Sequence, residues 1–404
     1  MSRAGGSAPG SALARPTLRV GLVAGESSGD QLGAALIEAL RERVGALECF
    51  GVAGPKMAAA GCEVWESAES LAVMGFTEVL PHLPRLIRLR SGLAQRFAAA
   101  RPDVFIGIDA PAFNLGLAAR LHAAGLTTVQ YVAPQVWAWR QGRVRKIGRA
   151  CDLVLCLLPF ETDFFTAHGV DAQFVGHPLA DQIPLAADRA AARAALGLPS
   201  EATVVALLPG SRLGEVTRLG EDFLAAAAWI GAHRPGVRFV APMASARARE
   251  AFLNMRAQVP DLPDIMITDG QAQRVLAACD GALVASGTAT LETLLSRRAM
   301  VVAYRLGGFT AFLLRRLRLV KVPYFSQPNL LLGRAFVPEF FQEAVSGAAL
   351  GEALLARLDD PAYGRELAVE FERVHRTLRC GGAGRAADAI LRRLALAPAA
   401  QAEA

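Results

Sequence analysis

The sequence predicts an α/β protein in which two Rossmann-like lobes face a cleft and C-terminal helices cross back to the first lobe. Apolar runs bounded by turn residues alternate with helical stretches through most of the 404 residues, as in β-α units around parallel sheets. A glycine and two prolines at 176–184 interrupt this alternation, and a fresh series then begins. The chain is also too long for one ordinary core, which favours two domains.

The expected strands form two series. They are 18–24, 103–109, 127–133 and 152–159 in the first lobe, and 203–210, 237–243, 264–268, 281–286 and 300–305 in the second. We expect the lobes to span 17–178 and 179–344, after a disordered lead-in at 1–16 that lacks the apolar region of a signal peptide. The Ala/Leu/Arg-rich segment 345–404 is expected to be a helical tail that packs on the first lobe.

Composition narrows the function classes. No apolar run reaches the roughly 18 residues of a membrane-spanning helix. The six Cys are scattered without a Cys-x-x-Cys pair, which favours a reducing cytosol and no structural zinc. The net charge of +6 indicates an anionic partner, namely nucleic acid, phosphorylated small molecules or an anionic membrane surface. No Gly-Lys-Ser/Thr loop is present, which disfavours a Walker-type NTPase.

The first strand ends in AGESSGDQLGA, which places Gly25 and Ser28 at a strand-to-helix turn. Glycines there let a ligand or a neighbouring segment approach the backbone, and the helix N-terminus attracts anions. The alternatives are helix capping by Ser27, Ser28 or Asp30 and close helix–strand packing at Gly33.

The strand DVFIGID places Asp109 at its carboxyl end, where open α/β sheets place ligand-binding groups. A carboxylate at this position is a candidate general base. The alternative is an N-cap of the helix that starts near Phe113.

Two turns of the second lobe are candidates for binding a diphosphate. The first, in LLPGSRLGEV, has Gly210 and Ser211 at the turn, with the Arg212 guanidinium beside them. A surface arginine is the alternative for Arg212.

The second turn lies in VASGTATLETLL, where Ser286 ends a strand, Gly287 forms the turn and Thr288 starts a helix. The N–H groups at that helix start are expected to hold a phosphate. Glu292, one turn later, is placed to accept hydrogen bonds from two ribose hydroxyls, with a helix-capping role as the alternative.

Missing motifs exclude other chemistries. The sequence has no Asp-x-Asp pair to bridge a metal ion to a diphosphate, and no GxSxG or HExxH motif. We therefore expect no metal and no cofactor. His177, at the joint between the lobes, is expected to be structural.

Ten segments together resemble the lipid-A-disaccharide synthase family, whose members are metal-independent, inverting glycosyltransferases of the B type (GT-B). They include AGESSGDQLGA, GIDAPAFN, YVAPQVWAWRQGRVRKIGRA, VGHPLAD, LLPGSRLGEV, LVASGTATLE and PYFSQPNLLLGR, and they are collinear over roughly residues 17 to 390. The sequence departs from the family pattern at Ala112, where a second Asp is usual, and at Gln135, where Ser is common.

The resemblance implies a reaction. UDP-2,3-diacylglucosamine would donate its sugar to the 6-hydroxyl of 2,3-diacylglucosamine 1-phosphate (lipid X), which gives the β(1→6) lipid A disaccharide 1-phosphate and UDP. The first lobe would bind the acceptor and the second the UDP-sugar. Asp109 would be the base, while Arg212 and the two second-lobe turns would stabilise UDP. Asn329, in SQPNLL, would be a further donor-site residue.

The family's acceptor side would include Gly25, Ser28 and Gln135, together with the segment that holds Trp137 and Trp139. The two tryptophans would form an apolar wall for an acylated sugar, while the cations after them face anionic groups. Packing within the loop is the alternative for each tryptophan.

A lipid substrate also implies contact with a membrane. In the segment 80–97, one helical face carries Leu86, Leu89, Leu93 and Phe97, with Arg85, Arg88 and Arg96 off that face. An amphipathic helix that packs on the core is the alternative. A second apolar-basic stretch lies at 309–322. We expect a cytoplasmic protein on the anionic inner-membrane surface, with a homodimer through the C-terminal helices as a further expectation.

Two rival functions remain. The first is another B-type enzyme that uses UDP-sugars, such as the muramyl-pathway N-acetylglucosaminyl transferase or a UDP-N-acetylglucosamine 2-epimerase. The second, suggested by the basic charge, is a nucleic-acid-binding protein without catalytic activity. The sequence disfavours this second rival because it has no RNP, KH or zinc-finger signature and few aromatic residues.

Overall fold

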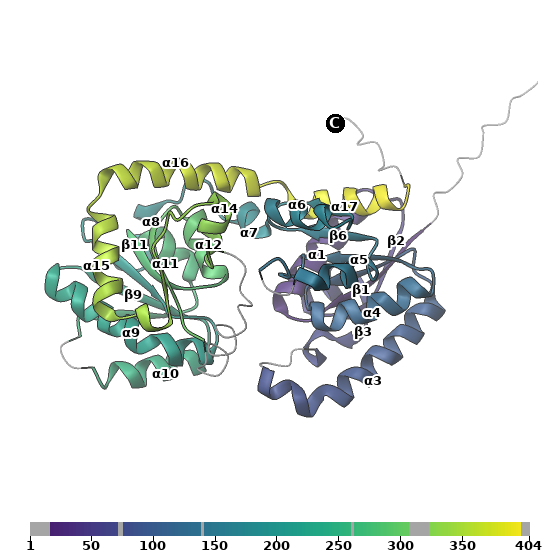
Figure 1. The fold of residues 1–404 in the computed structure, drawn as a ribbon, viewed down its shortest axis with the longest axis horizontal. Coiled ribbons are helices and arrows are strands. Elements are labelled where there is room, and N and C mark those ends of the chain that lie inside the picture. Colours follow the sequence, from purple (N-terminus) through teal and green to yellow (C-terminus); the bar gives the residue numbers. More distant parts are fainter. Residues whose placement is uncertain (1–16, 72–75, 139–140, 260–261, 307–322, 397–404) are drawn as a thin grey trace, which may run out of the picture.

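The computed structural model describes residues 17–71, 76–138, 141–259, 262–306 and 323–396. Two parallel sheets, each covered by helices, form two lobes that lie side by side (Figure 1). The prediction of two Rossmann-like lobes with C-terminal helices that cross back is confirmed. The predicted lead-in at 1–16 and the apolar-basic stretch at 309–322 lie outside the described residues.

The first sheet has seven strands in the order β3-β2-β1-β4-β5-β6-β7. The strands are β1 (Leu18–Ala24), β2 (Leu47–Ala53), β3 (Cys62–Ser67), β4 (Val104–Ile108), β5 (Thr127–Tyr131), β6 (Leu153–Cys156) and β7 (Ala172–Phe174). The helices are α1 (Ser27–Arg41), α2 (Pro55–Ala59), α3 (Phe76–Ala100), α4 (Pro111–Ala123), α5 (Val144–Gly148), α6 (Pro159–Ala167) and α7 (Pro178–Gln182). All residues of β4 are buried, as expected for a strand covered on both faces.

The second sheet has six strands in the order β10-β9-β8-β11-β12-β13. The strands are β8 (Val204–Leu208), β9 (Arg238–Met243), β10 (Ile265–Asp269), β11 (Gly281–Ala285), β12 (Ala299–Tyr304) and β13 (Glu339–Phe341). The helices from residue 189 onward are α8 (Arg189–Ala195), α9 (Leu213–His233), α10 (Ala246–Arg256), α11 (Ala272–Ala278), α12 (Thr288–Leu295), α14 (Gln327–Leu332), α15 (Gly347–Leu358), α16 (Pro361–Leu378) and α17 (Gly382–Arg393).

Strand order reverses at one point in each sheet, between β1 and β4 in the first and between β8 and β11 in the second. Ligands of open α/β sheets bind outside the carboxyl ends of the strands at such a switch point. The turns after these four strands carry Gly25, Asp109, Arg212 and Thr288. The fold therefore gathers the sequence-predicted candidates at two matching positions.

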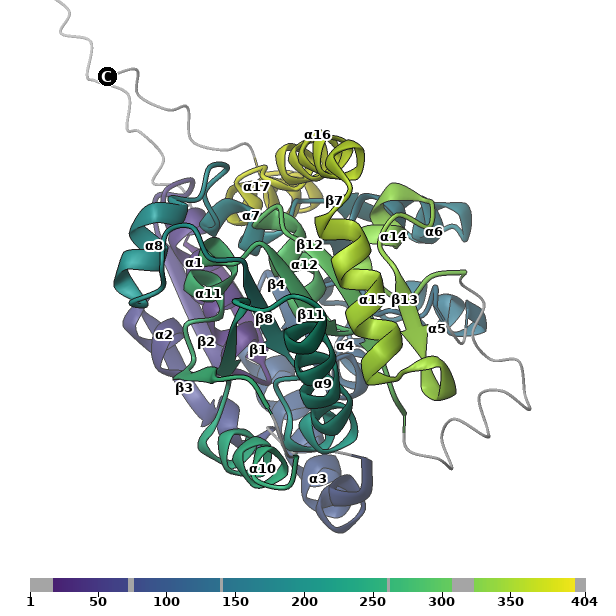
Figure 2. The same cartoon turned by 90° about the vertical axis from the view of Figure 1, so that its left-hand side faces the viewer.

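Helices α15, α16 and α17 differ in where they pack. Helix α15 packs on α9 and α16 on α12, both in the second lobe, whereas α17 packs on α1 of the first lobe (Figures 1 and 2). Ala386 and Ile390 of α17 belong to the core of the first lobe, and Asp388 pairs with Arg43 at 2.6 Å. Among the described residues of the predicted 345–404 tail, α17 packs on α1 of the first lobe, and α16 also contacts α7 at the joint between the lobes.

Helix α3 runs along the outer edge of the first lobe (Figure 1). Its predicted membrane-facing side is wrong for Leu93 and Phe97, which are 3% and 0% exposed and belong to the core. The Phe97 ring lies 4.9 Å from Trp65 and 5.3 Å from Phe105, measured between ring centroids. Leu89 packs against the same core, and Leu86 is half-buried. The alternative interpretation, a face that packs on the core, is correct for this side of the helix.

In the part of the chain that the structure describes, no helix combines the length and apolar character needed to cross a membrane.

Candidate functional site

The two lobes enclose a cavity of about 1950 Å³ at the carboxyl ends of both sheets. The first lobe lines it with residues from the turns after β1, β4 and β5, and the second with residues at the starts of α11, α12 and α14. They include Ser28, Asp109 and Gln135 on one side and Gln273, Thr288 and Gln327 on the other.

Asp109 is the half-buried residue directly after β4 and lines this cavity. The N-cap alternative for Asp109 is wrong, because α4 begins at Pro111 and Ala110 occupies its N-cap position. Burial raises the pKa of the Asp109 carboxyl above its usual range, while the Ala110 N–H and the Arg212 guanidinium oppose the rise. Arg212 belongs to the other lobe, so its charge acts on Asp109 between the lobes.

The glycines of the β1–α1 turn make room for neighbouring protein. A Cβ at Gly25 would lie 2.8 Å from the Cβ of Ala110, so this glycine lets the two turns of the switch point meet. At Gly33, a Cβ would lie 2.5 Å from the Met57 sulfur, which is the close-packing alternative. Gly25 is buried, whereas Ser28 is exposed and lines the cavity.

Asp30 caps a different helix from the one expected. Its buried carboxylate accepts hydrogen bonds from the N–H groups of Gly54, Lys56 and Met57 at 2.9–3.0 Å. It therefore caps α2, while Glu26 occupies the N-cap position of α1.

The turn after β8 holds Gly210, Ser211 and Arg212. The Glu215 carboxylate accepts hydrogen bonds from the N–H groups of Ser211 and Arg212, at 2.9 and 3.3 Å. These donors are thus already paired with an anion from their own helix, which differs from the expected open phosphate site. The Arg212 side chain is 70% exposed, with its guanidinium 3.8 Å from Glu215, so it remains accessible to a ligand.

The turn after β11 is more open. The Ser286 hydroxyl donates to the carbonyl of Phe325 at 3.0 Å, so its role in this structure is to hold the turn. Gly287 has a φ of 145°, and a Cβ there would meet nothing within 4 Å among the described residues. Thr288 lines the cavity at the start of α12. Burial raises the pKa of Glu292, one turn into that helix.

Asn329, expected as a donor-site residue, does not line the cavity. This residue is 1% exposed, and its side-chain amide is engaged within its own lobe. The Nδ2 atom donates to the Val337 carbonyl and to Glu339, and Oδ1 accepts from the N–H groups of Phe336 and Val337, all at 2.8–2.9 Å. With these bonds made, Asn329 fixes the segment that leads into β13.

Trp137 packs behind the cavity wall and does not line it. It is 8% exposed, its ring lies edge-on to Phe160, and its Nε1 donates to Glu161 at 3.2 Å. The loop-packing alternative is therefore correct for Trp137, while Trp139 lies outside the described residues. Gln135 and Glu161 line the cavity. Burial raises the pKa of Glu161 to about 7.

His177 also lines the cavity, at the joint between the lobes. Its Nδ1 accepts a hydrogen bond from the Leu179 N–H at 3.2 Å, and burial lowers its pKa to about 4. A neutral imidazole that caps α7 supports the expected structural role. Within the described residues, no three His, Cys, Asp or Glu side chains are grouped to hold a metal ion.

Comparison with known proteins gives one consistent family. A family model described as lipid-A-disaccharide synthetase matches residues 20–389. The lipid-A-disaccharide synthase of Pseudomonas aeruginosa strain UCBPP-PA14 is 54% identical over 374 residues, which cover 93% of this chain and 97% of that protein. The enzyme of the same name from Azotobacter vinelandii is 53% identical over 376 residues, with the same coverage.

Solved structures share the fold at low sequence identity. UDP-GlcNAc 2-epimerase from Neisseria meningitidis, bound to UDP-GlcNAc, has a TM-score of 0.62 at 11% identity, over 94% of this chain and 100% of that chain. CalG4, the calicheamicin glycosyltransferase, has a TM-score of 0.56 at 18% identity, over 94% and 98% of the two chains. These similarities place the fold in the GT-B class.

Proposed function

The chain belongs to the lipid-A-disaccharide synthetase family, and from this premise we propose how its cavity carries out the reaction. The protein is a glycosyltransferase that transfers the sugar of UDP-2,3-diacylglucosamine to the 6-hydroxyl of 2,3-diacylglucosamine 1-phosphate. The products are the β(1→6)-linked lipid A disaccharide 1-phosphate and UDP.

The position of Asp109 is the observation that carries the proposed mechanism. Its carboxylate stands at the carboxyl end of β4, in the cavity wall, with the charge of Arg212 acting on it from the other lobe. A base on one lobe and a cation on the other suit an in-line displacement between an acceptor and a leaving diphosphate.

In this mechanism Asp109 takes the proton of the acceptor 6-hydroxyl, and the oxygen of that hydroxyl attacks C1 of the donor sugar. The bond from C1 to the β-phosphate oxygen breaks, and the electron pair leaves with UDP. A single displacement inverts the configuration at C1. Burial makes the Asp109 carboxylate a stronger base than an exposed one, which favours proton transfer near neutral pH.

The second lobe would receive UDP. Arg212 is exposed and can pair with the diphosphate, and the open turn at Gly287 lets a phosphate approach the N-terminus of α12. Glu292 would accept hydrogen bonds from the ribose hydroxyls. Because Glu215 already occupies the N–H groups of Ser211 and Arg212, the α12 turn is the stronger backbone site for phosphate.

The first lobe would receive the acceptor. Ser28 and Gln135 offer polar groups on its side of the cavity, and the exposed Arg143 and Lys146 line the same wall. Two cations at this wall suit the 1-phosphate of the acceptor, since a phosphate carries more than one negative charge near neutral pH.

Replacing Asp109 with Asn tests the mechanism. We expect turnover to fall at least ~10²-fold, because loss of a general base typically costs about that much. UDP affinity should not change, since UDP binds on the other lobe. Asp103→Asn is the matched control, because Asp103 lies just before the same strand and accepts a bond from the Arg19 N–H at 2.8 Å, away from the cavity. Full activity of the Asp109 variant would remove this residue from the mechanism.

We propose that the protein also contacts an anionic membrane through α3, by a different face from the one predicted. Leu83 and Ile87 are 44% and 42% exposed and lie one helical turn apart, so they share a face. Arg85 and Arg88 are exposed on the same helix, and each basic residue near an anionic surface contributes about 1 kcal/mol. Contact of this size is reversible and salt-sensitive.

The double variant Leu83→Ser with Ile87→Ser tests this contact. We expect weaker co-sedimentation with phosphatidylglycerol vesicles and slower turnover of long-chain substrates, at unchanged UDP affinity. Val369→Ser is the control, because Val369 is exposed on α16 of the other lobe. Co-sedimentation equal to that of the parent would locate the contact elsewhere.

The expected homodimer through the C-terminal helices remains a prediction. Exchange of α17 between two chains would preserve its packing on an α1 helix. Cysteines at positions 43 and 388, introduced as Arg43→Cys with Asp388→Cys, would on oxidation link two chains if α17 is exchanged. A bond within one chain would contradict exchange.

A further inference from the structure

The backbone around Asp109 adopts conformations that non-glycine residues rarely take. Asp109 and Ala110 have φ values of 50° and 40°, and Val132, at the end of the neighbouring strand β5, has a φ of 76°. A β-branched residue with positive φ is a genuine outlier. Strain of this kind persists only where the surroundings hold it, and it gathers at functional sites.

Two buried side-chain amides hold this backbone. Gln130 Nε2 donates to the carbonyl oxygens of Asp109 at 3.1 Å, Val132 at 3.3 Å and Tyr131 at 3.4 Å. Asn114 Nδ2 donates to the Asp109 carbonyl at 2.9 Å. The same Nδ2 lies 3.2 Å from the carbonyls of Val23 and Ile108. The carbonyl of Asp109 therefore accepts from both amides, one from α4 and one from β5.

The carbonyl oxygens of these two side-chain amides make the arrangement energetically costly. Asn114 Oδ1 and Gln130 Oε1 are buried and have no hydrogen-bond partner in the described part of the chain. A buried acceptor without a donor is unfavourable, and an apolar side chain would avoid the cost. Both residues are nearly inaccessible, at 0% and 1% exposed, so solvent at the surface does not compensate. The NH₂ group of each side chain is therefore the part that makes hydrogen bonds within the structure.

Space for the two amides comes from Gly107 of β4. A Cβ there would lie 2.8 Å from the Asn114 Cβ and 3.2 Å from Gln130 Oε1. A side chain at this position would push one amide or both away from the Asp109 carbonyl.

We propose that Asn114 and Gln130 are positioning residues, which together fix the main chain of Asp109 and so direct its carboxylate at the acceptor hydroxyl. The inference rests on the proposed role of Asp109 as the base. A reacting group displaced by about 1 Å can cost ~10²-fold in rate, so main-chain anchors next to the base affect catalysis without touching substrate.

Asn114→Leu and Gln130→Met test the proposal, since each keeps the approximate size and removes the NH₂ group. We expect kcat to fall roughly 10- to 100-fold and KM for the UDP-sugar to change less than about 2-fold, because the donor binds on the other lobe. Thr128→Val is the matched control. Thr128 lies two residues before Gln130 on β5, is equally buried, and donates to the Ala150 carbonyl at 2.9 Å, away from the Asp109 turn.

The Thr128 variant is expected to lose stability and keep its kcat. A drop in kcat no larger than that of Thr128→Val in both amide variants would overturn the proposal. If Asn114→Leu fails to fold, Gln130→Met carries the test, because it leaves the Asn114 bond in place.

A double-mutant cycle separates positioning from general structural damage. In an Asp109→Asn background the base is already lost, so Gln130→Met should cause little further loss of turnover. A full additional loss would contradict the proposal. Full activity of Asp109→Asn alone would instead refute the base itself, whereas an inactive Asp109 variant with fully active amide variants would refute only this inference.

Discussion

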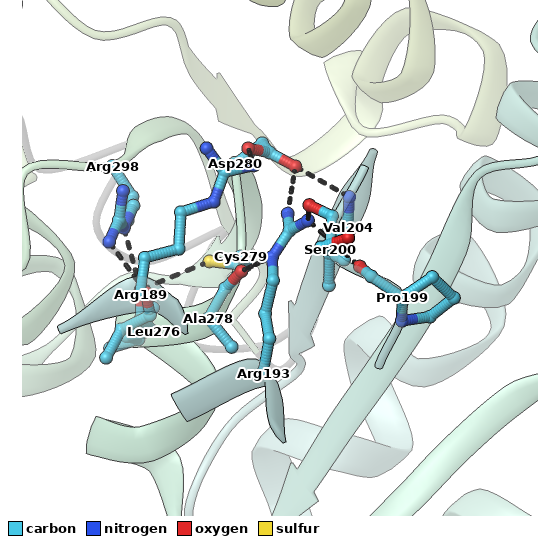
Figure 3. Close-up of polar contacts among 11 residues, drawn as sticks. Arg189, Arg193, Pro199, Ser200, Val204, Leu276, Ala278, Cys279, Asp280 and Arg298 are labelled. Atoms are coloured by element: carbon cyan, nitrogen blue, oxygen red, sulfur yellow. Dashed lines mark hydrogen bonds and ion pairs between the residues drawn. The ribbon is translucent and has the colours of Figure 1, made fainter. Parts of the chain in front are cut away.

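Replacing Arg193 with Met should destabilise the second lobe far more than replacing Arg189, although both arginines pair with Asp280. Arg193 of α8 is 2% exposed and reaches four acceptors (Figure 3). Its guanidinium donates to the carbonyls of Ala278 at 2.9 Å, Pro199 at 3.1 Å and Ser200, and to Asp280 at 2.9 Å. Through these bonds it fixes α8 and residues 199–200 to the segment that joins α11 to β11.

The magnitude follows from what each substitution leaves behind. Removing one partner of a buried, hydrogen-bonded ion pair costs about 3–5 kcal/mol, because the remaining buried groups lose their donor. Asp280 would still accept from the Val204 N–H at 2.8 Å and from Arg189, which places the expected loss near the lower end of that range. The Arg189 side chain is 46% exposed, and an exposed pair is worth about 0–1 kcal/mol.

Urea denaturation followed by circular dichroism measures both variants. The two lobes need not unfold together, so the relevant transition is the one that UDP shifts to higher urea. We expect a loss of about 3 kcal/mol for Arg193→Met and less than about 1 kcal/mol for Arg189→Met. Equal losses for the two variants, or a loss below about 1 kcal/mol for Arg193→Met, would refute the reasoning from burial.

Three further predictions concern pH, metal dependence and packing. Glu161 has its pKa raised by burial from 4.5 to about 7, so the folded protein retains a proton that the unfolded chain has released. The free energy of unfolding is therefore not reduced by this group below about pH 4.5. It falls by up to about 3 kcal/mol as the pH rises from there to about 7. Glu161→Gln should flatten this dependence in urea titrations at pH 5 and 8, and parallel profiles for parent and variant would contradict it. EDTA should leave the initial rate unchanged, because the sequence has no Asp-x-Asp pair, and a strict Mg²⁺ requirement would contradict that expectation. Phe97→Ala should cost about 3–5 kcal/mol in thermal or urea unfolding, as for a fully buried aromatic, and a loss below about 1 kcal/mol would mean that α3 does not pack on the core.

The architecture and the position of the cavity were predictable because their signals are local. Buried strands of a parallel sheet appear in the sequence as continuous apolar runs, and glycines at their carboxyl ends indicate turns. Strand β2 was missed although Cys49–Ala53 form a continuous buried run, whereas β3 was missed because polar residues interrupt it. In β3 (CEVWES), four of the six residues are exposed and one is half-buried, so it resembles a surface segment.

Other parts of the site depend on contacts that no local pattern contains. Asn329 lies in the second lobe near the proposed UDP site, yet its side-chain oxygen accepts hydrogen bonds from the N–H groups of residues 336 and 337. Asn114 and Gln130 were missed because a buried amide looks like any polar residue in the sequence. Only the pairing of β4 with β5 and the start of α4 bring them together beneath Asp109.

Helix α3 illustrates an ambiguity of periodicity. An apolar stripe at helical spacing looks the same whether it packs on a core or lies on a membrane. Here Leu93 and Phe97 pack on the core, while Leu83 and Ile87, on a neighbouring face, stay exposed. The sequence pattern located the helix, and the surrounding fold decided which of its faces is buried.

Mass spectrometry of one reaction tests the central claim most directly. The mixture contains the purified protein, UDP-2,3-diacylglucosamine, 2,3-diacylglucosamine 1-phosphate and EDTA. We predict equal amounts of UDP and of a tetraacyl disaccharide 1-phosphate, with at least ~10²-fold less disaccharide formed by the Asp109→Asn variant over the same time. Absence of the disaccharide from the parent reaction, together with turnover of unacylated UDP-N-acetylglucosamine in a parallel reaction, would contradict the assignment.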